Sequence, residues 1–170
     1  MKTPQQQALT RIRICMVVII GGLFISGATA FPLETELGWL AANMQALPLP
    51  LQHWLSNIYN ALRNTNQQYP YLAYGTDWLA FAHLVLAVLF IGPYRHPVKN
   101  LWVVQFGMVA SVAIFPLAFI AGGIRGVPLF WQIIDCSFGV ICMLPLSIAY
   151  KNIKKLREYY ANKGITVAEI

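Results

Sequence analysis

Five polar residues are set among long apolar runs: Asp77, His83, Arg125, Gln132 and Asp135. A histidine and an aspartate within reach of each other can act as general acid and base. An aspartate in hydrocarbon costs about 2.5–3.5 kcal/mol on insertion scales, and such residues normally face the interior of a bundle and pair there. We therefore take His83 and Asp135 as candidate catalytic residues and all five as candidate ligand-binding residues. Asp135 should find its partner among His83, Gln132, Arg125 and backbone groups.

Three interpretations of this cluster stay open. It can be a hydrogen-bonded pair that fixes helix register, the polar end of an outward-facing pocket, or part of a proton or ion route. The route is the weakest of the three, because each helix carries one acid and no continuous polar stripe follows the chain.

Other chemistry has little support, and whether the chain is an enzyme stays undecided. No GxSxG, HExxH or Walker motif occurs. The three cysteines, Cys15, Cys136 and Cys142, have no spacing typical of zinc or iron–sulfur sites. His83 is the one histidine within the apolar core, which excludes bis-histidine haem ligation in a single chain. We expect no metal and no cofactor.

The composition indicates a chain that lies mostly in lipid. Of its 170 residues, 58% are hydrophobic and 11% are charged, whereas soluble domains carry about 25% charged residues. We predict an all-α integral membrane protein, a single domain over residues 1–170 built as a four-transmembrane-helix bundle. The predicted spans are residues 14–30, 77–93, 101–121 and 127–149. A basic cytoplasmic tail over 150–170 follows.

The first apolar run has a second interpretation. It ends in Ala28-Thr29-Ala30 after a basic start, which also fits the cleavage site of a signal peptide. We predict that it stays as the first span.

Residues 31–76 form the longest segment between spans. After Pro48 and Pro50, apolar residues recur at helical spacing from Leu51 to Leu62, and polar residues occupy the opposite side. We predict an amphipathic helix here that ends at Asn64-Thr65-Asn66. Such a helix between spans usually lies in the membrane interface or caps the bundle, as a simple lid or as a gate over a pocket.

The basic residues predict an orientation, because Lys and Arg are enriched in cytoplasmic segments. Ten of the twelve fall on one side: Lys2, Arg11, Arg13, Arg95, Lys99, Lys151, Lys154, Lys155, Arg157 and Lys163. Both termini are then cytoplasmic in a cell-membrane protein and the 31–76 insert is outside.

At about 1.5 Å per residue, His83 lies about 9 Å and Asp135 about 12 Å from the outer helix ends, so the two can meet. The charge of +6 then reports topology and attraction to anionic lipid, and we expect no nucleic-acid partner.

In its outline the chain resembles the small four-helix membrane proteins of the DoxX and emopamil-binding types. The resemblance covers the topology of the whole chain and no specific motif, so it assigns no catalytic residue. The emopamil type places more acidic groups in its cavity than the single deep Asp135 here, which argues against the same chemistry.

Three functions are compatible with these features. The first is binding of a lipid-like or small apolar ligand in an outward-facing intramembrane pocket. The second is a non-catalytic subunit or assembly factor of a larger membrane complex, with another membrane protein or a second copy as partner. The third is a membrane enzyme that uses His83 and Asp135 for proton transfer.

Overall fold

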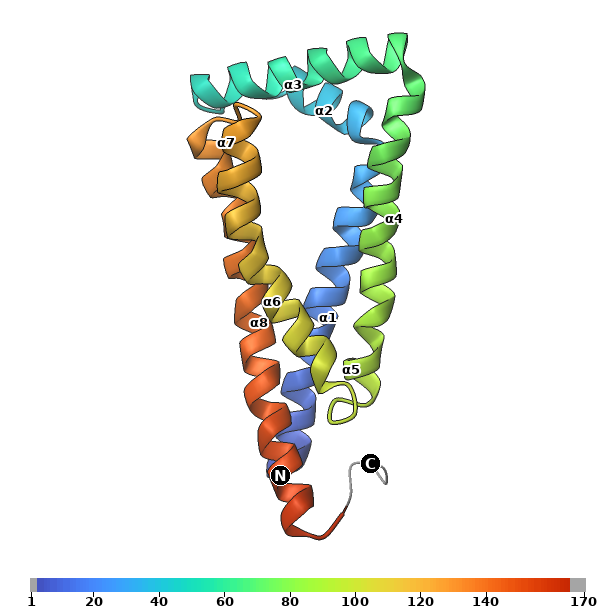
Figure 1. Ribbon diagram of the computed structural model, residues 1–170, viewed down its shortest axis with the longest axis vertical. Helices are drawn as coiled ribbons and strands as arrows, with labels where there is room; N and C mark the ends of the chain where they lie inside the picture. Colours follow the sequence, from blue (N-terminus) through green and yellow to red (C-terminus); the bar gives the residue numbers. More distant parts are fainter. Residues whose placement is uncertain (1–2, 166–170) are drawn as a thin grey trace. The chain divides into compact units, whose positions relative to one another are not determined.

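The computed structural model describes residues 3–165, and every regular element in that range is a helix (Figure 1). The elements follow in chain order as α1 (Pro4–Ala30), α2 (Leu33–Ala42), α3 (Leu49–Gln68), η1 (Pro70–Ala73), α4 (Tyr74–Leu89), α5 (Ile91–Arg95), α6 (Leu101–Pro116), η2 (Leu117–Ala121), α7 (Gly122–Ile124) and α8 (Leu129–Asn162). Here η1 is a 3₁₀ turn and η2 is a π-helical turn. Lys2 and positions 166–170 of the predicted tail lie outside the described residues.

Four helical segments of the described residues are long and apolar enough to cross a membrane, which confirms the prediction of an all-helical chain with four such helices and suggests a multi-pass membrane protein. They are Pro4–Ala30, Pro70–Arg95, Leu101–Ile124 and Leu129–Asn162. The first begins ten residues before the predicted span, because no glycine or proline interrupts the chain between Gln5 and Ile20. The last joins the predicted fourth span and most of the basic tail into one helix of 34 residues.

The second span starts and ends differently from its prediction. Helix α4 already begins at Tyr74, three residues before the predicted start at Asp77, which lies in its first turn. Gly92-Pro93 does not end the segment, which continues as α5 to Arg95. Pro93 is tolerated because it occupies the first turn of α5, where a helix does not need the backbone N–H.

The predicted end of the inserted helix at Asn64-Thr65-Asn66 is also wrong. Helix α3 continues to Gln68 and ends at Tyr69, which has φ −137° and ψ 63°. Tyr69 precedes Pro70, and a proline disfavours the helical conformation of the residue before it. The asparagines are compatible with a helix and do not by themselves stop it.

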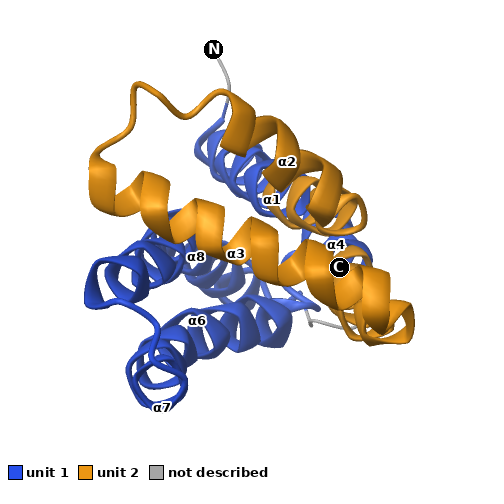
Figure 2. Ribbon diagram, turned by 90° about the horizontal axis from the view of Figure 1, so that it is seen from above, with its two compact units in different colours: residues 1–21, 87–170 blue, residues 22–86 orange. Residues whose placement is uncertain are grey.

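The chain divides into two compact units, coloured separately in Figure 2. Unit 1 comprises residues 1–21 and 87–170, and unit 2 comprises residues 22–86. The boundary in α1 falls between Gly21 and Gly22. Each unit is described by itself.

Unit 1 is built around the pairing of α6 with α8, which lie side by side (Figure 1). Small residues bring the two backbones close, as is common where membrane helices pack. A Cβ atom at Gly139 would lie 2.6 Å from the backbone oxygen of Ser111, and one at Gly107 would lie 3.2 Å from Leu146. The Ser111 hydroxyl donates to Gly107 O within its own helix at 2.8 Å, so the interface leaves this buried donor satisfied.

Unit 2 shows the same kind of close approach between the end of α1 and α4. A Cβ atom at Gly27 would lie 2.8 Å from Ala80 O, and Ala80 is fully buried. Helices α2 and α3 pack along each other, and Asn66 Nδ2 of α3 donates to Glu34 Oε2 of α2 at 2.7 Å. That bond joins the last turns of α3 to the first turn of α2.

Candidate functional site

A pocket of about 290 Å³ lies in unit 1 where α6, η2, α7 and α8 meet, and we call it the Asp135 pocket. Its polar groups are Asp135 and Arg125. Its other lining residues are apolar or lack a side chain: Ile114, Leu117, Ala118, Ala121, Gly122 and Val127. The pocket is therefore an apolar space with one carboxyl group and one guanidinium group.

The apolar wall is shaped by Pro116. Because proline lacks a backbone N–H and its ring clashes with the preceding turn, the regular helix α6 ends there and Leu117–Ala121 form a π-helical turn. The predicted span over residues 101–121 did not include a π-helical turn. Single π-helical turns inside helices are frequent at functional sites, and this one presents Leu117, Ala118 and Ala121 to the pocket.

The turn from α7 to α8 positions Arg125 and Val127. Gly126 has φ +67°, a left-handed conformation that glycine adopts without strain. The N–H of Val127 donates to Gly122 O at 2.9 Å and the N–H of Gly126 donates to Gly123 O at 3.2 Å. This is the bonding pattern of a Schellman helix end. The N–H of Arg125 is bonded to Ala121 O as well, so these three groups are already used and do not face a ligand.

Gln132 holds this turn in place and does not line the pocket. It is 7% exposed, and its Nε2 donates to Val127 O at 2.7 Å. Its side chain lies against Gly122, where an added Cβ would come within 3.0 Å of Gln132 Cγ. The amide thus satisfies the carbonyl of a pocket residue from behind.

Asp135 lies one helical turn after Gln132 and lines the pocket, with its side chain partly exposed. Its carboxyl group makes no hydrogen bond or ion pair with another residue in the described range 3–165, and neither does the guanidinium group of the exposed Arg125, which also lines the pocket. The carboxyl group therefore keeps its full capacity to bond a donor that enters the pocket.

The other two predicted residues belong to unit 2. His83 is partly buried on α4, and its Nδ1 lies 2.8 Å from Leu79 O. A carbonyl only accepts hydrogen bonds, so Nδ1 carries the proton and Nε2 is left for another partner. Asp77 lines an apolar groove with Phe31, Tyr74, Trp78 and Phe81.

A second polar group in unit 2 brings the predicted Asp77 together with two residues, Glu34 and Asn66, that were not predicted as site residues. Glu34, Asn66 and Asp77 line one pocket of about 200 Å³. Asn66 Oδ1 is buried and has no hydrogen-bond partner. The sequence contains no signal for this arrangement, because the pattern placed Asn66 at a helix end and said nothing of its contact with Glu34.

The Asp135 pocket combines features of a site for an amphiphile. Its apolar wall suits a hydrocarbon or ring, and its carboxyl group suits a hydroxyl or ammonium donor.

No group of three or more metal-ligating side chains gathers within the described residues. No protein-family model, curated protein or solved structure matches the chain.

Proposed function

We propose that the chain is a multi-pass protein of the cell membrane that binds a lipid-like or small apolar ligand in the Asp135 pocket. The observation that carries this proposal is an aspartate without a side-chain partner among the described residues, in an apolar pocket of about 290 Å³. Intramembrane carboxyl groups normally pair inside the protein because they are expensive in hydrocarbon. A ligand that donates a hydrogen bond to Asp135 supplies the missing partner.

The size and lining of the pocket support an amphiphile with a small polar group. A volume of about 290 Å³ is at the lower end for ligand pockets, so it holds one ring system or part of an acyl chain. Arg125 lies at the rim, where it attracts an anionic or carbonyl group of the same ligand. We therefore favour a ligand with a donor and an acceptor at one end and an apolar body.

The proposed orientation puts this pocket at the outer side of the membrane. Of the basic residues on the two sides, Arg63 and Arg125 are the outer ones, and the positive-inside bias puts both termini in the cytoplasm. In this arrangement α2 and α3 form the outer insert. The apolar positions Leu51, Leu55 and Ile58 recur at helical spacing on α3, which supports an interfacial placement of that helix.

Native mass spectrometry of the detergent-purified protein tests the proposal, with Asp135→Asn beside the wild type. We expect the wild type to carry, or to take up from a total lipid extract of its host membrane, a molecule of defined mass. The affinity of the Asp135→Asn protein for this molecule should be lower by at least about tenfold, as expected when a hydrogen bond to a charged group is removed. Glu158→Gln is the matched control, because it neutralises an exposed acid further along the same helix.

Equal ligand retention in Asp135→Asn and Glu158→Gln would contradict the assignment of the site. A wild-type protein that neither carries nor takes up any molecule would contradict the function, and would favour the alternative of a non-catalytic subunit of a larger complex.

A further inference from the structure

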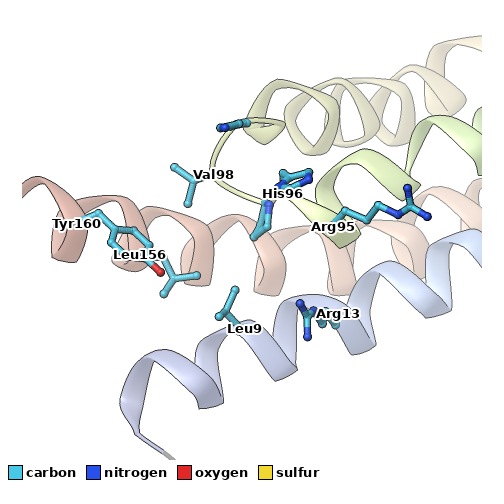
Figure 3. Close-up of a pocket in the computed structure, with 9 residues that line it drawn as sticks. Leu9, Arg13, Arg95, His96, Val98, Leu156 and Tyr160 are labelled. Carbon is cyan, nitrogen blue, oxygen red and sulfur yellow. The ribbon is translucent and has the colours of Figure 1, made fainter. Parts of the chain in front are cut away.

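A second pocket in unit 1, of about 150 Å³, lies among the first turns of α1, the connection from α5 to α6 and the last turns of α8. We call it the basic pocket. Figure 3 shows Leu9 and Arg13 extending from α1, with Leu156 and Tyr160 reaching toward them from α8. His96 lies on the connecting turn above them. Three separate segments of the chain therefore contribute to one small space.

The charges around this space are of one sign. Arg13, Arg95 and Lys99 line it together with His96, and no acidic side chain of residues 3–165 does. Glu158 is two positions from both Leu156 and Tyr160, and residues two apart on a helix do not share a face.

No acidic side chain of the described residues pairs with the two arginines. Arg13 lies over the Tyr94 ring, with its Cζ 5.8 Å from the ring centre. Within the described range, neither Arg13 nor Arg95 has an ion-pair partner, and both side chains are exposed. Arg95 extends away from Leu156 at the rim in Figure 3. Both guanidinium groups are free to pair with an anion from outside.

The floor of the pocket is apolar and tightly packed. Val98 is 6% exposed and Leu156 is 2% exposed, and the neighbouring Ile153 is fully buried. Tyr160 adds a hydroxyl at the edge. The cations beside this floor come from two segments of the chain, Arg13 from α1 and Arg95 and Lys99 from the α5–α6 region.

We infer that the basic pocket binds the phosphate group of an anionic phosphate monoester or diester. Arginine presents a planar fork of donors that matches phosphate oxygens in pairs. Leu9 and Leu156 would contact the first carbon atoms that follow the phosphate. A basic pocket between membrane helices on the cytoplasmic side is also a known type of site for anionic lipid headgroups. The inference does not depend on the proposed function of the Asp135 pocket.

The position along the bundle fits a headgroup. Asp135 and Leu156 are 21 positions apart on α8, which is about 32 Å at about 1.5 Å per residue. A bilayer's hydrocarbon core is about 30 Å thick. Because Asp135 lies about 12 Å from the outer helix end, the basic pocket lies past the opposite edge of the hydrocarbon core, outside the acyl chains.

Titration of the detergent-purified full chain with dioleoyl phosphatidylglycerol, read by native mass spectrometry, tests the inference. We expect the protein to bind a first phosphatidylglycerol molecule, and to bind phosphatidylcholine several-fold more weakly in its place. Arg13→Gln combined with Arg95→Gln should weaken phosphatidylglycerol binding by about tenfold or more, since each basic residue near a membrane contributes on the order of fivefold.

The matched control is Arg11→Gln combined with Lys154→Gln, which removes the same charge from the same end of unit 1. Neither residue lines the basic pocket. We expect this control to weaken phosphatidylglycerol binding by less than half as much, on a logarithmic scale, as Arg13→Gln combined with Arg95→Gln. Equal weakening in both double variants would overturn the inference in favour of diffuse attraction, and unchanged binding in Arg13→Gln/Arg95→Gln would overturn it as well.

Two further arms complete the test. Arg13→Lys with Arg95→Lys keeps both charges and must bind more tightly than the glutamine variant; equal weakness of the two would overturn the inference. Competition with glycerol 3-phosphate separates the two sources of phosphate: displacement of the lipid identifies a soluble phosphate ester as ligand, and no displacement identifies the lipid headgroup. Asp135→Asn should leave phosphatidylglycerol binding unchanged, which keeps the two sites distinguishable.

Discussion

The two pockets of unit 1 lie toward opposite ends of α8 and differ in how their charges relate to their surroundings. In the Asp135 pocket a single acid faces apolar walls and has no partner among the described residues. In the basic pocket three cations surround an apolar floor at the level of the proposed interface. One places a polar group where the solvent is hydrocarbon, and the other places charges where water and lipid phosphates are available.

This difference decides how informative each charge is. Cations at a membrane surface are inexpensive, because long side chains reach water, so their number alone reports topology. An unpaired aspartate in an apolar pocket is expensive, so even one such residue calls for a function. In the basic pocket, the convergence of three segments on one floor distinguishes a site more than the charge does.

The largest effect is expected when the scaffold shared by both pockets is broken. In Gly139→Val, the new Cβ would lie 2.6 Å from the Ser111 backbone oxygen, so α6 and α8 have to separate. We expect a loss of about 3 kcal/mol in unfolding free energy and loss of ligand from both pockets. Gly22→Val is the control, because a Cβ there meets no atom within 4 Å. Unchanged stability of Gly139→Val in thermal unfolding would show that α6 and α8 do not pack through this glycine.

The next largest effect is expected when the acid of the Asp135 pocket is replaced by an apolar residue. This change should raise the stability of the protein and weaken ligand binding. Asp135→Leu removes an acid without a partner, and we expect the ligand-free protein to gain up to about 3 kcal/mol while the Asp135 pocket loses its ligand. Unfolding in bicelles with and without the host lipid extract measures both. A loss of stability would instead favour the interpretation in which Asp135 belongs to a hydrogen-bonded pair that fixes helix register.

A smaller effect is expected at Gln132, which supports the pocket from behind. Gln132→Ala leaves Val127 O without its side-chain donor and opens a gap beside Gly122. We expect a loss of about 1–3 kcal/mol and weaker ligand binding, without an effect on the basic pocket. Gln105→Ala, at an exposed glutamine of α6, should leave stability unchanged when measured in the same way. Equal losses in both variants would refute this role for Gln132.

The smallest effect is expected at the rim. Arg125 is exposed and has no ion-pair partner among the described residues, so Arg125→Gln should not change the unfolding temperature. We expect a few-fold loss of ligand affinity, as for a partly solvated charged group. Arg63→Gln on α3 is the control for charge at the proposed outer side. A loss of ligand as large as that of Asp135→Asn would show that Arg125, and not the acid, dominates recognition.

Much of the fold could be predicted because a membrane span is a run of apolar residues that are contiguous in the sequence. Long apolar runs interrupted by Gly122–Gly126 and by the polar turn after Pro93 predicted four helices, and four helices of sufficient length and apolarity are present. The boundaries were less accurate where short-range chemistry competes. The start at Tyr74 and the end at Tyr69 depend on the proline between them and its 3₁₀ turn.

The candidate site could be predicted only in part. Asp135 and Arg125 stood out from sequence as charges near apolar runs, and both line one pocket. Gln132 was singled out for the same reason, yet its amide is used on Val127 O. Glu34 and Asn66 meet across 32 positions of sequence, and no local pattern reports a contact between two helices.

By itself, the sequence determined that lipid is the main solvent of the chain and where the helices that meet it run, because hydrophobicity and helical bonding are properties of contiguous residues. Only the tertiary structure decided that the π-helical turn after Pro116 opens a space beside Asp135, and that Leu9, Val98 and Leu156 share one floor beneath Arg13. Those features depend on how α6 and α1 each pack against α8. This packing decides which side chains are left without protein neighbours.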